Sequence, residues 1–530
     1  MVEKNMKRIY SEDPWIKKVF SKIKPPSLSD NTADVDRLRK SLEKEIKSRN
    51  LNVNLSLMKR VSNILREQEY NIDAVIYEYQ GVFFLVDIFP SGTTVLYGLA
   101  VDIGTSTVVA RLMDLSSGKT KDEFSFHNPQ IQMGSDILSR IHFASKENGL
   151  EELRSAVIDR FNSEVYAIAE KNKIDPSSIT GMAIAGNTTM THLFLGLDPY
   201  WICREPYIPV VNRVDILNAS VTGIKINPNA PIMIMPNVGS YFGGDLISGI
   251  LASGMTTKSE IAFFVDVGTN AEVVIGNKDW LMACAGAAGP ALEGGVADMG
   301  MMAGEGVIDE IVFNSREKNF EWGTIGGKKP IGICGSGMID LVAELFINGM
   351  IDIRGKFVPE MCGGSLIEID EISHLIVVPE KYSGTGKALT LSQPEIDGLM
   401  RSKAAMYAIL TTISNNVGIK LNDIGRFYVA GTFGSYIKPR SAVTIGMIPD
   451  LPIETYVPLG NTSLEGAEMV LLSQKARDEA LEIRDRITYV ELNVNQEFMN
   501  LFSAAKFIPH TDKGLFPSVQ SKGTYDIKWR

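Results

Sequence analysis

The spacing of apolar residues predicts a small α/β domain near the start of the chain. Residues 33–69 show helical periodicity, in which Leu38 and Leu42 lie four positions apart on one face. Residues 72–97 then change to strand character, with glycine- and proline-containing turns between the strands. The residues before them are charged at first and then rich in proline and serine, which is typical of a tail or linker. We therefore expect a tail or linker over residues 1–30 and a small α/β domain over 31–97.

The rest of the chain repeats one pattern twice. Residues 98–104 (GLAVDIG) and 261–268 (IAFFVDVG) are apolar strands that end in Asp–x–Gly, and further strand candidates follow each of them. A repeat of this kind predicts two related halves. We place the first half at 98–260, the second at 261–510 and a carboxyl-terminal tail at 511–530. Helices are expected at 135–147, 152–171, 336–348, 400–417 and 463–480, and the residues from 508 onward are expected to be extended.

Composition and charge exclude several classes of protein. Of the 530 residues, 45% are apolar and 22% are charged, which is ordinary for a folded globular protein. The formal net charge of −10 argues against binding to nucleic acid or to a membrane surface, because either needs a basic face. Charge runs through the first residues, so no signal peptide is expected, and no apolar run reaches the roughly 18 residues of a membrane span. We expect a cytoplasmic protein.

The cysteine pattern predicts no iron–sulfur cluster within this chain. Cys203, Cys284, Cys334 and Cys362 are far apart in the sequence. A cluster needs three or four closely spaced cysteines, and a zinc site needs comparable pairs of Cys or His.

The two Asp–x–Gly segments have the chemistry of phosphate-binding hairpins. An apolar strand delivers a carboxylate, and the glycine lets the chain turn tightly. The hydroxyls and backbone N–H groups that follow suit phosphate oxygens, while the carboxylate suits Mg²⁺ or its bound water. We expect Asp102 and Asp266 to act in catalysis and hold the metal. We expect phosphate contacts from Gly104, Thr105, Ser106, Thr107, Gly268, Thr269 and Asn270.

A third segment, FYVAGTFGS at 427–435, runs from a strand into a turn of small residues. Together with the two hairpins it resembles the sugar kinase, heat-shock chaperone ATPase and actin superfamily, in which such a turn binds adenosine. The superfamily usually has Gly–Gly where this chain has Gly431 and Thr432. The resemblance implies adenosine contacts from Gly431, Thr432, Phe433, Gly434 and Ser435.

Longer segments narrow the resemblance to one family. They are AGNTTMTHLFLG at 185–196, EPYIPV at 205–210, MPNVGSYFGGDLISGIL at 235–251, ACAGAAGPALEGG at 283–295, GICGSGMIDLVAELF at 332–346, SKAAMYAIL at 402–410 and PLGNTSLEGA at 458–467. With them the chain resembles the ATP-dependent reductive activators of corrinoid proteins over about residues 25–515. In that resemblance residues 31–97 correspond to the family's small middle domain.

The resemblance carries expectations about fold and function. The fold would be α/β, with a duplicated actin-like (ribonuclease H-like) ATPase core that has ATP and Mg²⁺ in its cleft. The activity would return a corrinoid protein from inactive Co(II) to Co(I). The partner would be a corrinoid iron–sulfur protein or the corrinoid subunit of a methyltransferase, and a homodimer is compatible with this. Many family members carry an iron–sulfur domain, so the low-potential electron donor here would be a separate protein or a domain missing from this chain.

At three further places in the sequence, a functional and a purely structural role are both possible. Asp245 follows two glycines at a predicted helix start, where it orders the attacking water or the magnesium shell, or caps the helix. Gly335 and Ser336 open a helix whose N-terminus suits phosphate or ribose, or form a capping turn. Lys403 resembles the superfamily position on a helix beside adenosine, or is a solvated surface lysine.

Asn187 and Asn461 lie in two Gly–Asn–Thr turns and are expected to stabilise loop geometry. His192 is expected to be a structural histidine.

Three other functions stay open. A small-molecule kinase of the same fold needs a general base for its acceptor, and Asp245 is the only candidate. An assembly or chaperone-like ATPase would do no redox chemistry. An activator of radical dehydratases needs a close cysteine pair, which Cys284 and Cys334 do not form.

Overall fold

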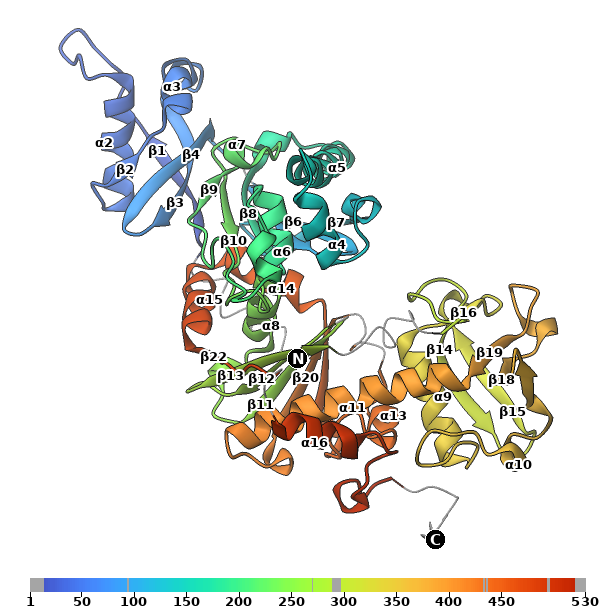
Figure 1. Cartoon of the computed structure of the whole chain (residues 1–530). Helices are drawn as coiled ribbons and strands as arrows, with labels where there is room; N and C mark the ends of the chain where they lie inside the picture. Colours follow the sequence, from blue (N-terminus) through green and yellow to red (C-terminus); the bar gives the residue numbers. More distant parts are fainter. Residues whose placement is uncertain are drawn as a thin grey trace. The chain divides into compact units, whose positions relative to one another are not determined.

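The computed structural model describes residues 14–92, 95–268, 270–287, 297–431, 434, 437–492 and 496–519. Its contacts divide the chain into two compact units, which are described separately (Figure 1). The first unit holds the chain up to Gly254 together with Thr462–Arg486, and the second holds Met255–Asn461 together with the chain from Ile487 onward. No helix in the described part of the chain is long and apolar enough to cross a membrane.

A four-stranded sheet in the order β1-β3-β4-β2 begins the first unit. Its elements are β1 (Ile16–Lys22), α2 (Asp34–Ile46), β2 (Leu51–Asn52), α3 (Leu55–Glu67), β3 (Asn71–Tyr79) and β4 (Val82–Pro90). Both helices cover one face of the sheet, because their apolar stripes are buried in one cluster with alternate residues of β3. The Asn54 side chain starts α3 by accepting a hydrogen bond from the N–H of Leu57.

Strand β1 shows that part of the expected tail or linker over residues 1–30 folds into a sheet. All seven residues of β1 pair antiparallel with β3, from Ile16 opposite Tyr77 to Lys22 opposite Asn71. The strand lies at the edge of its sheet, and its lysines point to solvent. Exposed lysines are common on edge strands because they block pairing with further strands. Their presence in β1 interrupts the alternation of apolar residues by which a strand is recognised in a sequence.

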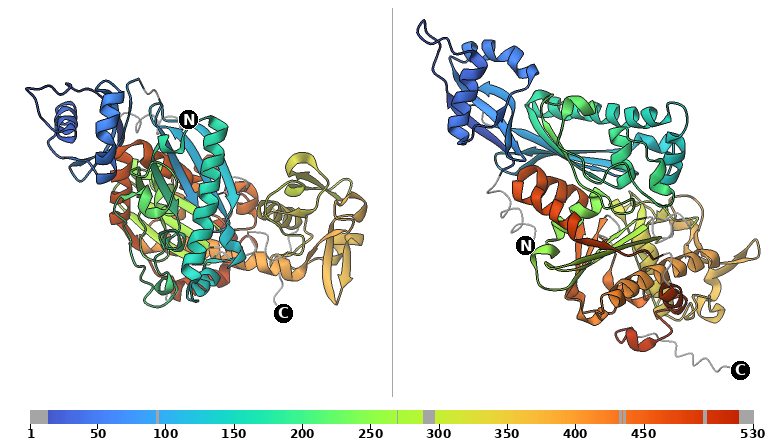
Figure 2. Two further views of the ribbon diagram at one scale, coloured as in Figure 1. Left: turned by 90° about the horizontal axis from the view of Figure 1, so that it is seen from above. Right: turned by 60° about the vertical axis from the view of Figure 1, so that its left-hand side comes forward.

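The larger sheet of the first unit has six strands in the order β7-β6-β5-β8-β10-β9. Its strands are β5 (Tyr97–Ile103), β6 (Thr107–Asp114), β7 (Lys119–His127), β8 (Ile179–Gly186), β9 (Leu217–Asn218) and β10 (Pro231–Ile234). The helices of this part are α4 (Ile137–Ala144), α5 (Gly149–Asn172), α6 (Thr188–Leu195), α7 (Ala219–Thr222), α8 (Gly244–Ser253), α14 (Thr462–Leu472) and α15 (Gln474–Arg486). The long helix α5 packs on one face of the sheet, as Figure 2 shows.

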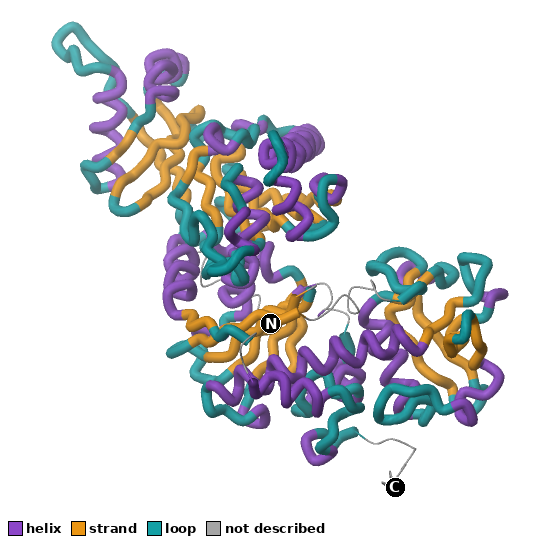
Figure 3. Tube along the Cα trace, viewed as in Figure 1, coloured by secondary structure: helices purple, strands orange, loops and turns teal. Residues whose placement is uncertain are grey.

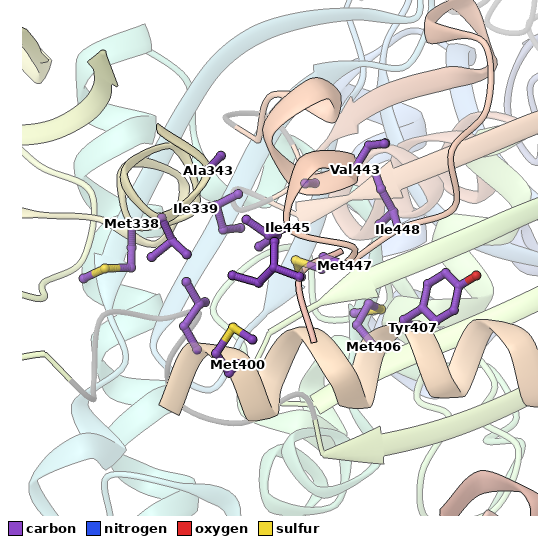
Figure 4. Packing of buried hydrophobic residues seen from close by; sticks show 14 of the residues in the cluster. Met338, Ile339, Ala343, Met400, Met406, Tyr407, Val443, Ile445, Met447 and Ile448 are labelled. Carbon is purple, nitrogen blue, oxygen red and sulfur yellow. The ribbon is translucent and has the colours of Figure 1, made fainter. Parts of the chain in front are cut away.

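The main sheet of the second unit also has six strands, in the order β21-β20-β11-β12-β13-β22. Its strands are β11 (Ala262–Val267), β12 (Asn270–Gly276), β13 (Leu281–Ala287), β20 (Arg426–Ala430), β21 (Tyr456–Gly460) and β22 (Ile487–Tyr489). The helices α11 (Gln393–Asn416), α13 (Pro439–Thr444) and α16 (Gln496–Ala505) belong to the same unit. Apolar side chains from α11 and its neighbours, among them methionines and isoleucines, pack together in the core of this unit (Figure 4).

The strand orders confirm the duplicated α/β core. In the first unit, β5, β6 and β7 form an antiparallel meander, and β8 and β10 then add in parallel beside β5. In the second unit, β11, β12 and β13 form the same meander, and β20 and β21 add in parallel beside β11. Both sheets therefore follow the order third, second, first, fourth, fifth strand.

Between β13 and α11 the second unit carries an additional lobe with two three-stranded sheets, β15-β14-β16 and β17-β18-β19. Figure 3 shows these strands apart from the main sheet. The elements are β14 (Val307–Asn314), β15 (Asn319–Thr324), β16 (Gly332–Ile333), α9 (Gly335–Ile347), α10 (Pro359–Cys362), β17 (Leu366–Ile369), β18 (Ile372–Val378) and β19 (Leu389–Ser392).

Two expectations about the last part of the chain were wrong. The helix expected at 463–480 is two helices, because the Ser473 hydroxyl accepts from the N–H of Ala476 and so caps the start of α15. The residues from 508 onward are not an extended tail as far as the structure describes them. Ile508 and Phe516 are buried, and the Phe516 ring lies 5.3 Å from that of Tyr407 on α11.

Candidate functional site

Asp102 lies at the carboxyl end of β5, on the face of the sheet that α14 covers. Side chains alternate along a strand, so Asp102 shares its face with Gly98, where the chain packs against Leu471 of α14. The hydroxyl of Ser463, in the first turn of α14, donates a 2.8 Å hydrogen bond to Oδ1 of Asp102. This contact orients the carboxylate at the strand end.

The first hairpin turn, residues 104–107, is closed by Gly104. The Gly104 N–H donates to the carbonyl of Thr107 over 3.0 Å. A Cβ at residue 104 would lie 2.6 Å from that same oxygen, which is closer than van der Waals contact allows. The turn therefore requires glycine at this position.

The carbonyl oxygens of the first hairpin turn accept hydrogen bonds from within the unit. The Asn128 side chain donates to the carbonyl of Gly104, and the Asn128 N–H donates to that of Ser106, each over 2.9 Å. Nη2 of Arg140 donates to the carbonyl of Thr105 over 2.6 Å.

These carbonyl contacts determine where the N–H groups of the turn point. In a planar trans peptide the C=O of one residue and the N–H of the next point in opposite directions. Since the carbonyls turn toward Asn128 and Arg140, the N–H groups of Thr105, Ser106 and Thr107 turn away from these side chains. Successive N–H groups on one side of a turn suit an anion such as phosphate.

Asn187 brings a second loop to the hairpin. It follows β8, which pairs in parallel with β5 so that Gly186 lies beside Ile103. Nδ2 of Asn187 donates to Oγ1 of Thr105 over 3.1 Å, and its Oδ1 caps α6 by accepting from the N–H of Met190. The side chain therefore stabilises loop geometry, as expected.

Asp245 begins α8 close to Asn187. A Cβ at Gly243 would lie 2.3 Å from the Cα of Asn187 and 2.6 Å from Oδ1 of Asp245. The same Oδ1 accepts from the N–H of Leu246 over 2.8 Å, a contact within the first turn of the helix. The first unit thus gathers Asp102, the hairpin turn, Asn187 and Asp245 at the carboxyl ends of its parallel strands.

In the second unit Asp266 lies near the carboxyl end of β11, beside Ala430 of the parallel strand β20. Gly431 follows with φ of +81°, a conformation that favours glycine. A Cβ at Gly431 would lie 3.1 Å from Oδ1 of Asp266. Asp266 and the first residue of the predicted adenosine turn therefore lie together at the carboxyl ends of β11 and β20.

The two Gly–Asn–Thr turns are not copies of each other. Asn187 follows β8, the fourth strand of the first sheet, whereas Asn461 follows β21, the fifth strand of the second. By strand order the counterpart of the Ala–Gly–Asn segment at 185–187 is the Ala–Gly–Thr segment at 430–432. By strand order, the predicted adenosine turn thus corresponds to the loop that carries Asn187.

Several predicted nucleotide contacts cannot be placed. Thr269, Thr432, Phe433 and Ser435 lie outside the described residues. Of their neighbours, Gly268 is half-buried at the second hairpin and Asn270 begins β12. Gly434 is buried, with its Cα so close to Val429 that a Cβ would lie 2.5 Å from the Val429 Cγ1 atom.

Gly335 and Ser336 form the buried first turn of α9. The Ser336 hydroxyl lies 3.1 Å from Sγ of Cys334. Gly337 approaches β14 so closely that a Cβ would lie 2.6 Å from the carbonyl of Ile308. The described contacts of this helix start are with its own unit.

Lys403 has a different setting from the predicted surface or adenosine contact. Its side chain is fully buried on α11, and Nζ donates to the carbonyls of Phe507 and, over 2.8 Å, Pro509. Burial lowers the pKa of Lys403 well below its ordinary value. In the described structure the Lys403 amino group holds the carboxyl-terminal segment to α11.

Sequence reasoning missed Asn128, Arg140 and Ser463. Arg140 had a signal, because it stands on the apolar stripe of its helix, three positions after Ile137 and one before Ile141. A charged residue on a buried face needs a partner, and this one reaches the hairpin. Asn128 and Ser463 are ordinary polar residues whose contacts come from distant segments.

Comparison with known proteins shows which family the chain belongs to. The model described as the C-terminal domain of RACo, the ASKHA domain, matches residues 260–520, the RACo middle region matches 97–258, and the RACo linker region matches 5–95. The chain belongs to the RACo family. In the family's own division residues 31–95 fall in the linker region and the middle region begins at residue 97, whereas residues 31–97 were expected to be the small middle domain.

Family relatives match nearly the whole chain. It is 30% identical over 484 residues to the corrinoid activation enzyme RamQ of Eubacterium limosum, covering 89% of this chain and 79% of that protein. It is 24% identical over 443 residues to a Methanosarcina barkeri reductase of the Co(II) methylated amine-specific corrinoid protein, covering 77% of this chain and 76% of that one. A solved reductive activator for corrinoid iron–sulfur protein aligns with a TM-score of 0.85 and 39% identity, covering 96% of this chain and 81% of that one.

Proposed function

We propose that this chain is an ATP-dependent reductive activator that returns a corrinoid protein from Co(II) to Co(I). The observation that carries the proposal is its similarity, over most of its length, to proteins named for the activation or reduction of corrinoid proteins. The duplicated core supports it, because each sheet presents an aspartate and a glycine turn at the carboxyl ends of its parallel strands.

The described residues fit a magnesium nucleotide. Asp102 at the end of β5 and Asp266 near the end of β11 each offer carboxylate oxygens, the ligands that Mg²⁺ prefers, and we assign the ordering of water to Asp245 in the first turn of α8. The first hairpin turn offers outward N–H groups to phosphate, and the backbone at Gly431 leaves room that a Cβ would fill. When bound, Mg²⁺–ATP would supply charge neutralisation and the binding energy that favours one conformation over another.

The corrinoid reduction is a one-electron step, and each 59 mV of unfavourable potential lowers its equilibrium constant about tenfold. Cys203, Cys284, Cys334 and Cys362 are far apart in the sequence, whereas an iron–sulfur cluster needs three or four closely spaced cysteines. We propose that the electron comes from a separate iron–sulfur protein or domain. The partner would be a corrinoid iron–sulfur protein or a methyltransferase corrinoid subunit.

Anaerobic visible spectroscopy tests the proposal. Candidate Co(II) corrinoid proteins are mixed with a low-potential reductant, with and without this chain, ATP and Mg²⁺. We expect a rise of the Co(I) spectrum that requires both the chain and ATP. If no candidate shows a nucleotide-dependent rise, and the chain instead transfers phosphate to a small acceptor, the kinase function replaces this one.

A further inference from the structure

We infer that Arg140 is a positioning residue for nucleotide binding, which orients the first hairpin turn and supplies a buried positive charge behind its phosphate-facing N–H groups. The inference rests on the proposed function, since it assigns the hairpin to ATP. Arg140 lies on α4, between the apolar side chains of that helix, and its side chain is fully buried.

The hydrogen bonds of Arg140 tie three segments together. Besides the Thr105 carbonyl, Nε donates to the carbonyl of Gly134 over 2.9 Å, and Nη1 donates to Oε1 of Gln130 over 3.2 Å. Gln130 is itself fully buried and donates to the carbonyl of Leu153 on α5. The guanidinium is thus held in one orientation by several hydrogen bonds to buried parts of the unit.

The charge of Arg140 is poorly compensated by the protein. Its described acceptors are neutral: carbonyl and amide oxygens and, over 3.2 Å, the thioether sulfur of Met190. Among the described residues no carboxylate forms an ion pair with it. Asp136, at the start of the same helix, acts on it electrostatically, but Oδ1 of that carboxylate accepts from the N–H of Ser139. Burial lowers the pKa of Arg140 to about 10, so it stays charged near neutral pH.

An uncompensated buried cation is costly unless an anion approaches it. The peptide group that joins Thr105 to Ser106 has its carbonyl directed at Arg140, because that oxygen accepts a hydrogen bond from Nη2 of Arg140. Its N–H is directed to the opposite, outward side of the turn. A phosphate on the outward N–H groups would therefore lie on the far side of that peptide from the guanidinium. Phosphate charge would offset the cost of burying Arg140, and Arg140 would strengthen phosphate binding in return.

Isothermal titration calorimetry of the full chain with Mg²⁺–ATP and with adenosine tests the inference. We expect R140M to weaken ATP binding about tenfold or more and to leave adenosine binding unchanged. R140K keeps the charge but loses the planar fork, so its ATP affinity should lie between wild type and R140M. R154M is the matched control, because Arg154 of α5 also donates to a carbonyl, that of Thr222, but makes no described contact with the turn.

Two results would overturn the assignment: wild-type ATP affinity in a folded R140M, or equal weakening of ATP and adenosine binding. If R140M loses its cooperative melt, the same comparison in R140K decides the matter. A wild-type chain that binds no ATP would instead count against the proposed function, whereas normal wild-type binding with an unaffected R140M would count against Arg140 alone.

Discussion

At the scale of single residues, Asp266 gives the most direct test of the proposed nucleotide site. Asp266→Ala removes the oxygens beside the β20 turn, so ATP-dependent activation should be abolished while the protein stays folded. Activation is measured as the rate of Co(I) formation. Asp279→Ala is the control, because this exposed carboxylate lies in the loop between β12 and β13 of the same sheet. Full activity in the Asp266 variant would remove this residue from the site.

Substitution of Gly431 tests whether crowding of the Asp266 carboxylate, in addition to backbone strain, affects activity. Gly431→Ala places a Cβ at positive φ and also 3.1 Å from the Asp266 carboxylate, whereas Gly418→Ala has the same kind of φ, +68°, in open space. Each variant should lose about 1–2 kcal/mol of unfolding free energy in denaturant titrations. Only the Gly431 variant should also lose ATP-dependent activation. Equal activity in the two variants would contradict the contact with Asp266.

His192 should make stability depend on pH. Its Nδ1 lies 2.7 Å from the Thr188 carbonyl, and Nε2 accepts from the N–H of Val210, so the ring is neutral. Burial lowers the pKa of His192, and below pH ~6.5 the unfolded chain then binds more protons than the folded one. The unfolding free energy should fall as pH falls, by up to about 1.4 kcal/mol at pH 5.5.

Urea titrations at pH 7.5 and 5.5 measure that change. His192→Gln should reduce it, while replacement of the exposed His142 should not. An unchanged pH dependence in the His192 variant would assign the effect to other groups, such as His510, whose pKa burial also lowers.

At the scale of elements, α11 and the carboxyl-terminal segment form one packed unit. Lys403→Met leaves the carbonyls of Phe507 and Pro509 without their donor, so we expect a loss of about 2–3 kcal/mol of unfolding free energy. Proteolysis near residues 507–519 should become faster. Replacement of exposed Lys506 by Met serves as the control. Unaltered proteolysis in the Lys403 variant would show that apolar packing alone holds the segment.

The elements also show what a sequence can reveal. The repeated Asp–x–Gly strands predicted the duplicated core, because the apolar strand, the carboxylate and the glycine are all local. The edge strand β1 escaped prediction, since lysines cover its exposed face. Local patterns singled out Asp102 and Gly104 as candidate site residues, but Ser463 touches Asp102 from 361 positions away, a contact that no local pattern contains.

At the scale of the whole molecule, a buried polar network joins the small amino-terminal sheet to the rest of the first unit. Asp87 of β4 accepts from Arg60 over 2.8 Å and from Nδ2 of Asn227 over 2.6 Å. Asn229 reaches back to the carbonyl of Val86 over 3.1 Å. These contacts cross from one sheet to the other within a single compact unit.

Asn227→Ala should therefore loosen this junction. The variant leaves Asp87 buried without one of its donors, so we expect a loss of about 1–3 kcal/mol and faster proteolysis near residues 90–97. Asn162→Ala removes a comparable pair of backbone contacts, at Gly223 and Lys225, away from the junction. Similar cleavage in both variants would indicate general destabilisation and not a weakened junction.

The interrupted path of the chain through the first unit has a consequence for how the protein is made. A ribosome that has finished residue 254 has produced both sheets of that unit but not α14 or α15, which follow only after the second half has been translated. Until then the side of β5 that bears Asp102 lacks its covering helix, so the nascent amino-terminal half should rely on shelter from chaperones. A premature stop between 461 and 486 would accordingly damage the earliest-made part of the protein.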